Sequence, residues 1–150
     1  MNQAAEKLEK QANQLSLHFE QLMIYIVQSQ QGGELNDLSK QEANVVYTLG
    51  ERGALIMREL ADNLRLHVST MTGIVDKLTE KKLVSRERTE EDRRIVRVGL
   101  TEKGKFAYQQ EAEKRKQLSL ALLNPLKPDE REVLLHLFSK VIGELEKQSQ

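Results

Sequence analysis

The 150-residue sequence contains no cysteine. The absence of thiols excludes disulfides, thiolate nucleophiles, cysteine-ligated metal sites and thiol-based redox sensing. It also suits a protein of a reducing compartment. Any chemistry that the chain performs must therefore use other side chains.

Long apolar runs are absent as well. The longest, residues 22–27, is far shorter than the roughly 20 residues that a helix needs to span a bilayer. The first ten residues are polar and of mixed charge, without the apolar stretch of a signal peptide. We therefore expect a cytoplasmic protein that does not enter a membrane.

Net charge is also missing, because 23 Lys and Arg residues balance 23 Asp and Glu residues. The charges are unevenly placed, however. Residues 65–105 hold 11 basic and 7 acidic side chains, whereas the rest of the chain holds 12 basic and 16 acidic ones. A basic middle suits a nucleic-acid binder, since partners respond to local charge. Ordinary fluctuation on a highly charged surface explains the same asymmetry equally well.

A hydrophobic content of 39% suits one folding unit, and the apolar pattern is mainly helical. Apolar residues recur every three or four positions over residues 8–26, which predicts a long amphipathic helix that ends at residues 31–33. Ser39 followed by Glu42 predicts a capping box at the start of a second helix. Two further helices are expected near 105–123 and after a turn at 124–129.

Residues 57–78 have the pattern of a helix-turn-helix. Two helices are predicted, near 57–63 and 68–82, with the small residue Ala61 where they must touch. Hydroxyls at a helix N-terminus can bind phosphates or base edges, so the second helix would lie in a major groove. A plain helical hairpin has the same apolar pattern.

A β-hairpin is predicted next, with strands at 84–88 and 95–100 around a charged turn. A helix-turn-helix that continues into a hairpin with a basic tip is a winged helix, and an arginine at the tip can enter a narrow minor groove. Arg93 and Arg94 are the candidates, and the carboxylate of Asp92 can orient a guanidinium group. A solvated charged turn is the alternative.

These segments closely resemble the multiple-antibiotic-resistance regulator (MarR) family. The family's motifs appear in its order and spacing as Leu60-Ala61, Ser69-Thr70-Met71-Thr72-Gly73-Ile74-Val75-Asp76-Lys77-Leu78, Leu83-Val84-Ser85-Arg86, Asp92-Arg93-Arg94 and Leu100-Thr101-Glu102-Lys103-Gly104. The resemblance implies a mainly α-helical winged helix-turn-helix with a small β-hairpin wing. In this single chain, residues 37–104 would form the DNA-binding lobe, and residues 5–30 and 105–148 a helical dimerisation region.

The resemblance also implies a function, that of a sequence-specific transcriptional regulator. It indicates a homodimeric repressor that binds an inverted-repeat operator in double-stranded DNA and is released by a small phenolic or other aromatic effector. The helix face and the resemblance together give the candidate DNA-binding residues His67, Val68, Ser69, Thr70, Thr72, Gly73, Lys77, Arg86, Arg88, Asp92, Arg93 and Arg94. Among them, Arg94 would enter the minor groove with Asp92 as its brace.

Two groups of implied site residues have ordinary structural alternatives. Arg86 and Arg88 would approach phosphates, or else pair across the strands with Glu87 or Glu102. The effector pocket would include Phe19, Met23, Tyr47 and His18, although each of the four also fits a core position.

Three features depart from the family's pattern. Arg65 and Lys82 stand where the family often has glycine, so non-glycine residues must adopt unfavourable backbone angles or the turns must differ. Gly73 stands where relatives often carry a long basic side chain, so specificity would depend more on DNA shape. His67 occupies an N-cap position, where it either contacts phosphate or caps poorly.

The apolar positions on the first and last helices exceed what one small winged domain can bury, so a partner chain is expected. Enzymatic sites are not indicated. The three histidines His18, His67 and His136 are isolated, and no cofactor or metal site is expected. The alternative function is that of a winged-helix scaffold or antirepressor that binds protein and has no operator.

Overall fold

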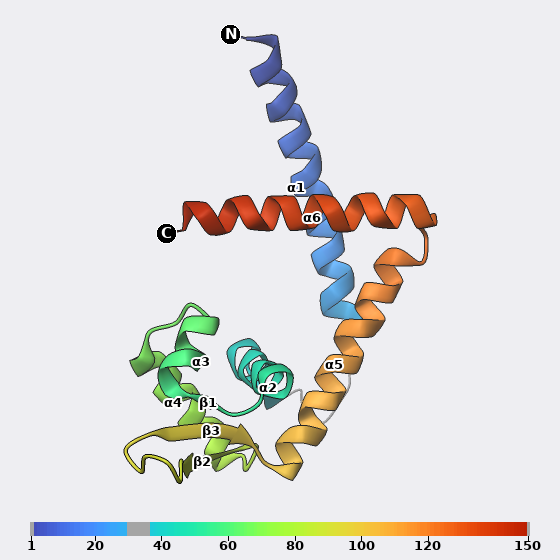
Figure 1. Ribbon diagram of the computed structural model, residues 1–150. Helices are drawn as coiled ribbons and strands as arrows, with labels where there is room; N and C mark the ends of the chain where they lie inside the picture. Colours follow the sequence, from blue (N-terminus) through green and yellow to red (C-terminus); the bar gives the residue numbers. More distant parts are fainter. Residues whose placement is uncertain (1, 30–36, 150) are drawn as a thin grey trace. The chain divides into compact units, whose positions relative to one another are not determined.

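The computed structural model describes residues 2–29 and 37–149. Its elements run from α1 (Gln3–Ser29) and α2 (Lys40–Arg52) through β1 (Leu55–Ile56), α3 (Met57–Asn63) and α4 (Val68–Glu80) to the hairpin of β2 (Val84–Arg88) and β3 (Val96–Leu100). Two long helices follow, α5 (Glu102–Leu123) and α6 (Pro128–Gln148) (Figure 1). The chain forms two compact units, Met1–Ala112 and Glu113–Gln150.

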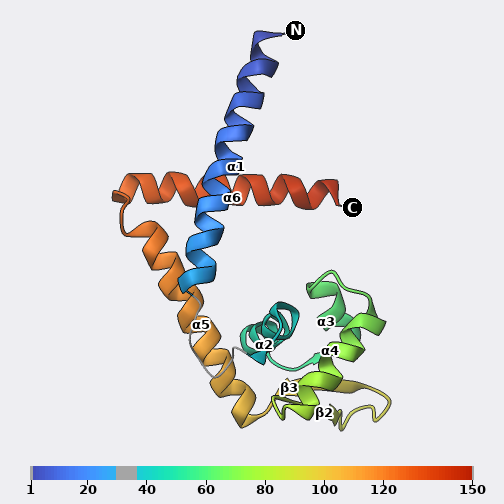
Figure 2. The same cartoon turned by 180° about the vertical axis from the view of Figure 1, so that it is seen from behind.

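The core of the first unit is the predicted helix-turn-helix. α3 and α4 pack against each other and against α2 and the sheet, and the four elements cluster together in both views (Figures 1 and 2). Ala61 is fully buried, as expected for a small residue where two helices touch. The other buried apolar residues are Val45, Val46, Leu49, Leu60, Met71, Ile74, Val75, Leu78, Leu83, Val84, Val98 and Ala107.

The wing contains one strand more than the sequence indicates. β2 and β3 form the predicted antiparallel hairpin, with Val84 opposite Leu100 and Arg88 opposite Val96. β3 begins at Val96, one residue later than predicted. β1 pairs with the other edge of β3, giving the order β1-β3-β2. A strand of two residues is too short to show an alternating pattern, so only its pairing reveals it.

The turns that follow α3 and α4 account for two of the departures from the family's pattern. Arg65 and Lys82 both have left-handed backbone angles, with φ of 54° and 60°. Only glycine adopts this region without a steric penalty. The predicted extension of α4 to residue 82 is wrong, because the helix ends at Glu80 and Lys82 cannot continue it.

The start of α5 explains why Thr101 and Gly104 occur together. The Thr101 hydroxyl accepts a hydrogen bond from the Gly104 amide at 3.0 Å and donates one to the Lys82 carbonyl at 2.6 Å. A Cβ on Gly104 would lie 1.9 Å from the Leu83 carbonyl oxygen. Thr101 therefore caps α5, which begins at Glu102 and not near residue 105 as the apolar spacing predicts.

The terminal helices α1 and α6 have no fully buried residue. Both expose large apolar side chains, for example Phe19 and Phe138, each 52% exposed. No helix in the described part of the chain is long and apolar enough to cross a membrane. The helix end predicted at residues 31–33 lies outside the described residues.

Candidate nucleic-acid interface

The residues proposed to contact DNA all lie on the surface of the first unit. α4 and its N-cap carry His67, Val68, Ser69, Thr70, Thr72, Gly73 and Lys77, and the hairpin carries Arg86, Arg88, Asp92, Arg93 and Arg94. All twelve are exposed, whereas Met71, Ile74, Val75 and Leu78 form the buried face of the same helix. The 3.6-residue period of α4 therefore separates a packing face from a polar, open face.

The N-terminus of α4 is suited to an anion. No acidic residue lies in its first turn, and His67 at the N-cap makes no side-chain capping bond. The first backbone N–H groups of a helix lack helical partners and carry partial positive charge. Within the described residues, the Ser69 and Thr70 hydroxyls have no hydrogen-bond partner, while the Thr72 hydroxyl donates to the Val68 carbonyl at 2.9 Å. Two hydroxyls and several amides are thus open to a phosphate.

The tip of the wing is held by Asp92, but not in the expected way. The Oδ1 of Asp92 accepts a hydrogen bond from the Arg94 backbone amide at 2.9 Å. The Thr89 hydroxyl donates to the Asp92 carbonyl at 2.7 Å and accepts from the Asp92 amide at 3.2 Å. The expectation that the carboxylate orients a guanidinium group is therefore wrong. Asp92 shapes the turn, and the Arg93 and Arg94 side chains make no ion pair with any described residue.

Arg86 pairs with α4 and not across the hairpin. Its Nη2 lies 2.5 Å from Oδ1 of Asp76 on α4. The suggested partners Glu87 and Glu102 are not used, because Glu87 lies opposite Arg97 and Glu102 pairs with Lys105. The pair joins β2 to α4 and so ties the wing to that helix.

A buried carboxylate that the sequence does not single out as functional connects α2 to the end of α4. Glu42 is 4% exposed, and its Oε2 lies 2.7 Å from Nζ of Lys81 and accepts the Ser39 amide at 3.1 Å. Burial alone would raise the pKa of Glu42. The bonds from Lys81 and Ser39, with the charges of Lys81 and Lys77, outweigh burial, so the pKa lies below its ordinary value. Only the capping box, which the structure confirms, could have pointed to Glu42.

The four residues predicted to line an effector pocket come from α1 and α2. His18, Phe19 and Met23 are exposed on α1. Tyr47 is half-buried on α2, with its ring 5.8 Å from that of Tyr108 on α5. Tyr108 in turn donates a hydrogen bond to Glu51, and this bond, with burial and the nearby charge, raises the pKa of the phenol.

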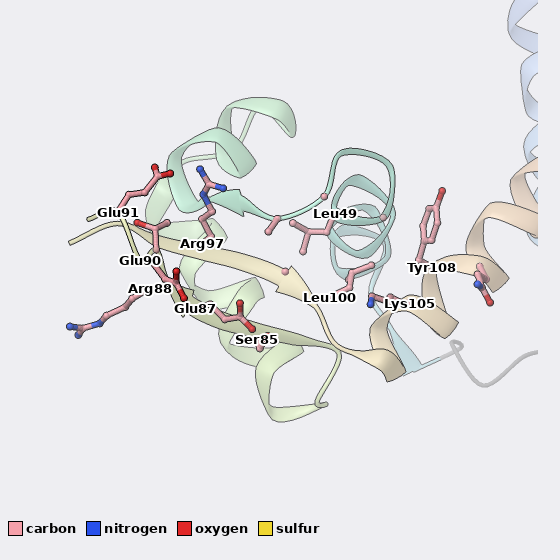
Figure 3. Close-up of a pocket in the computed structure, with 16 residues that line it drawn as sticks. Leu49, Ser85, Glu87, Arg88, Glu90, Glu91, Arg97, Leu100, Lys105 and Tyr108 are labelled. Carbon is pink, nitrogen blue, oxygen red and sulfur yellow. The ribbon is translucent and has the colours of Figure 1, made fainter. Parts of the chain in front are cut away.

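A cavity of about 850 Å³ lies elsewhere in the first unit. It is lined by Leu49 of α2, Leu100 of β3 and Tyr108 of α5, with Glu90 and Arg97 at the hairpin end (Figure 3). None of the four predicted effector contacts lines it. Across the described residues, no three His, Asp or Glu side chains gather into a group that could hold a metal ion.

Comparison with known proteins agrees with this geometry. A family model described as the MarR family matches residues 38–96. The uncharacterized HTH-type transcriptional regulator YpoP of Bacillus subtilis is 33% identical over 105 residues, covering 70% of this chain and 74% of its own. This chain belongs to the MarR family. It is a winged-helix, DNA-binding regulator of transcription.

Two further relatives are similar to this MarR-family protein over nearly its whole length. The HTH-type transcriptional repressor MdtR of Bacillus subtilis is 26% identical over 137 residues, 88% of each chain. The crystal structure of FabT from Streptococcus pneumoniae in complex with DNA superposes with a TM-score of 0.79 at 21% identity, covering 94% of this chain and 98% of that one. The family match runs from the start of α2 to the start of β3 and so includes all twelve proposed DNA contacts.

Proposed function

We propose that this MarR-family regulator is a homodimeric repressor that binds an inverted-repeat operator and is released by a small molecule. The observation that carries the proposal is the open polar face of α4 beside a wing whose tip presents Arg93 and Arg94, which form no ion pair with any residue that the structure describes. A buried apolar face fixes α4, the proposed recognition helix, to the lobe, so the outer face of α4 is free to enter a major groove.

The two parts of the interface would read DNA differently. The Ser69 and Thr70 hydroxyls and the α4 N-terminus would bind phosphate or base edges in the major groove, with Lys77 further along the helix. Arg94, positioned by the bond from its amide to Asp92, would enter the adjacent minor groove. Arg93 and Arg88 would contact the backbone. Arg86, which Asp76 already pairs, would act mainly by positioning the wing.

The terminal helices support a dimer. Exposed apolar side chains of this number and size are costly in water and mark a protein interface. They are Leu8, Leu15, Leu17, Phe19, Met23, Ile24 and Val27 on α1, and Val133, Leu135, Leu137, Phe138, Val141, Ile142 and Leu145 on α6. A two-fold dimer would repeat the α4 face about 34 Å away, one helical turn of DNA, so the operator would be an inverted repeat.

The repressor role and the effector rest on relatives. MdtR is named a transcriptional repressor. DNA binding by BpsR of Bordetella bronchiseptica is regulated by 6-hydroxynicotinic acid, and PcaV of Streptomyces coelicolor has been crystallised with its natural ligand. By analogy, an aromatic effector would bind near His18, Phe19, Met23 and Tyr47. It would favour a dimer in which the two α4 helices no longer fit consecutive grooves.

The proposal is tested by fluorescence anisotropy on DNA from immediately upstream of the protein's own gene. Saturable binding that weakens steeply as the salt concentration rises is expected. Each contact with a phosphate releases counterions from the DNA, and added salt makes this release less favourable. Arg94→Ala should weaken binding about tenfold and lower the salt slope by about one. Arg52→Ala removes an equal charge from the end of α2 and should leave binding unchanged, which makes it the matched control.

Other outcomes identify the alternatives. Wild-type affinity no better than for random DNA would rule out the upstream site. Failure on a randomised DNA library as well would contradict operator binding and favour a protein-binding scaffold. If operator affinity is unaffected by phenolic and other aromatic acids, release by an effector of that class is contradicted.

A further inference from the structure

The helical glycines of this protein differ in what would meet a side chain at each. A Cβ on Gly50 would lie 2.1 Å from the Tyr108 ring, and one on Gly104 would lie 1.9 Å from a backbone oxygen. Close packing within the lobe therefore requires glycine at both positions. A Cβ on Gly73 would meet nothing within 4 Å, and the same holds for Gly143 on α6. Packing gives no reason for glycine in the middle of α4.

Gly73 is also unfavourable for the helix that contains it. Glycine inside a helix loses more backbone entropy on folding than any other residue and is a poorer helix former than alanine. Its φ is not in the left-handed region, since Gly53 is the only glycine described with a positive φ. Neither a left-handed backbone nor a contact among the described residues requires glycine at position 73.

The surroundings of Gly73 indicate what approaches it. Residues three and four positions away share its face of the helix. These are Ser69 and Thr70 on one side and Asp76 and Lys77 on the other, and all four are exposed. The hydroxyls lack partners within the described chain, and Asp76 is held by Arg86 of the wing. Gly73 is thus a gap in the centre of the surface proposed to face DNA.

We infer that Gly73 determines specificity by leaving room for the edge of a base pair against the α4 backbone. The missing side chain lets the helix lie deeper in the major groove than an alanine would allow, and Ser69 and Thr70 then reach base edges as well as phosphates. An apolar contact of the Gly73 Cα with a thymine methyl group fits such an approach. The inference rests on the proposed operator binding.

The test compares Gly73→Ala with wild type on the operator and on random DNA of equal length. The variant should fold and melt a few degrees higher, because alanine favours the helix. Its operator affinity should fall about tenfold, as for a mismatched base pair, while its affinity for random DNA stays within about twofold. The specificity ratio, and not binding in general, is what the substitution should reduce.

Thr79→Ala is the matched control, because it also raises the helix propensity of α4. Thr79 lies six residues after Gly73, about 120° around the helix, and its hydroxyl bonds the Val75 carbonyl. The control should melt higher without losing specificity. Unchanged operator affinity of Gly73→Ala, or an equal loss on both DNAs, would overturn the inference alone. Wild-type protein that does not prefer any operator would overturn the proposed function with it.

Discussion

Glu42 is a buried charge whose environment favours its ionised form. Its folded-state pKa lies below the ordinary value of 4.5, because the bonds from Lys81 and the Ser39 amide outweigh the effect of burial. Such a group stabilises the folded state fully above about pH 4.5, and this contribution is lost as the pH falls through the folded-state pKa.

Glu42→Gln should therefore lower the free energy of unfolding by about 1.5–3 kcal/mol at pH 7, the range for a hydrogen bond to a charged group. The difference from wild type should shrink as the pH falls below about 4.5. Urea unfolding of both proteins at a series of pH values measures this difference in the free energy of unfolding. Glu102→Gln, which removes a highly exposed carboxylate, should change stability little at any pH. An equal effect of both substitutions at pH 7 would contradict the assigned role of Glu42.

Gly104 is required by the contact between the start of α5 and the chain that follows α4. Gly104→Ala would place a Cβ 1.9 Å from the Leu83 carbonyl oxygen, and a backbone atom cannot move aside as a flexible side chain can. We expect a loss of about 2–3 kcal/mol in urea unfolding, despite the higher helix propensity of alanine. Gly73→Ala, which adds the same methyl group in open space, is the control and should not destabilise the protein.

At the level of the element, α4 ends just before Lys82, whose backbone adopts a left-handed conformation that cannot continue the helix. The residue lies in the left-handed region, yet its amide bonds the Thr79 carbonyl and its carbonyl accepts the Thr101 hydroxyl. These bonds hold the turn between the end of α4 and the first strand of the wing, β2. Because the same conformation costs a non-glycine residue about 1–2 kcal/mol, the end of the recognition helix is stabilised by its neighbours and not by its own sequence.

A comparison of Lys82→Gly with Lys82→Ala isolates this strain. Both variants lose the same charge, but only glycine removes the Cβ that opposes the left-handed conformation. Lys82→Gly should be the more stable by about 1 kcal/mol in thermal or urea unfolding, after the greater flexibility of glycine in the unfolded chain is included. Equal stability of the two variants would show that the backbone at residue 82 is not strained.

For the whole molecule, the apolar faces of α1 and α6 predict association. Wild type should elute from size-exclusion chromatography with light scattering at twice the mass of one chain. Phe138→Asp places a charge on an exposed apolar face of α6 and should shift the protein to monomer, because an unpaired charge cannot be buried in an interface. Ser139→Asp adds the same charge at the next position and should keep the dimer. A monomeric wild type would contradict the homodimer.

Much of the candidate interface could be predicted because its signals are local. The period of α4, the hydroxyls after His67 and the basic tip of the hairpin are all visible within about 30 residues, and the structure exposes every residue named from them. The exact partners could not be predicted. Asp92 accepts a hydrogen bond from a backbone amide, and Arg86 pairs with Asp76. These partners depend on distances that are set only when the hairpin folds and β2 packs against α4.

The sequence by itself determined the order and type of the main elements, since apolar spacing, the Ser39 and Glu42 capping box and the Thr101 cap act between near neighbours in the chain. Only the tertiary structure decided the pairing of Glu42 with Lys81 across 39 residues, the third strand β1 and the contact that requires Gly104. The physical reason is that such contacts bring together segments far apart in the chain. They leave no period in the sequence and arise only when the lobe packs.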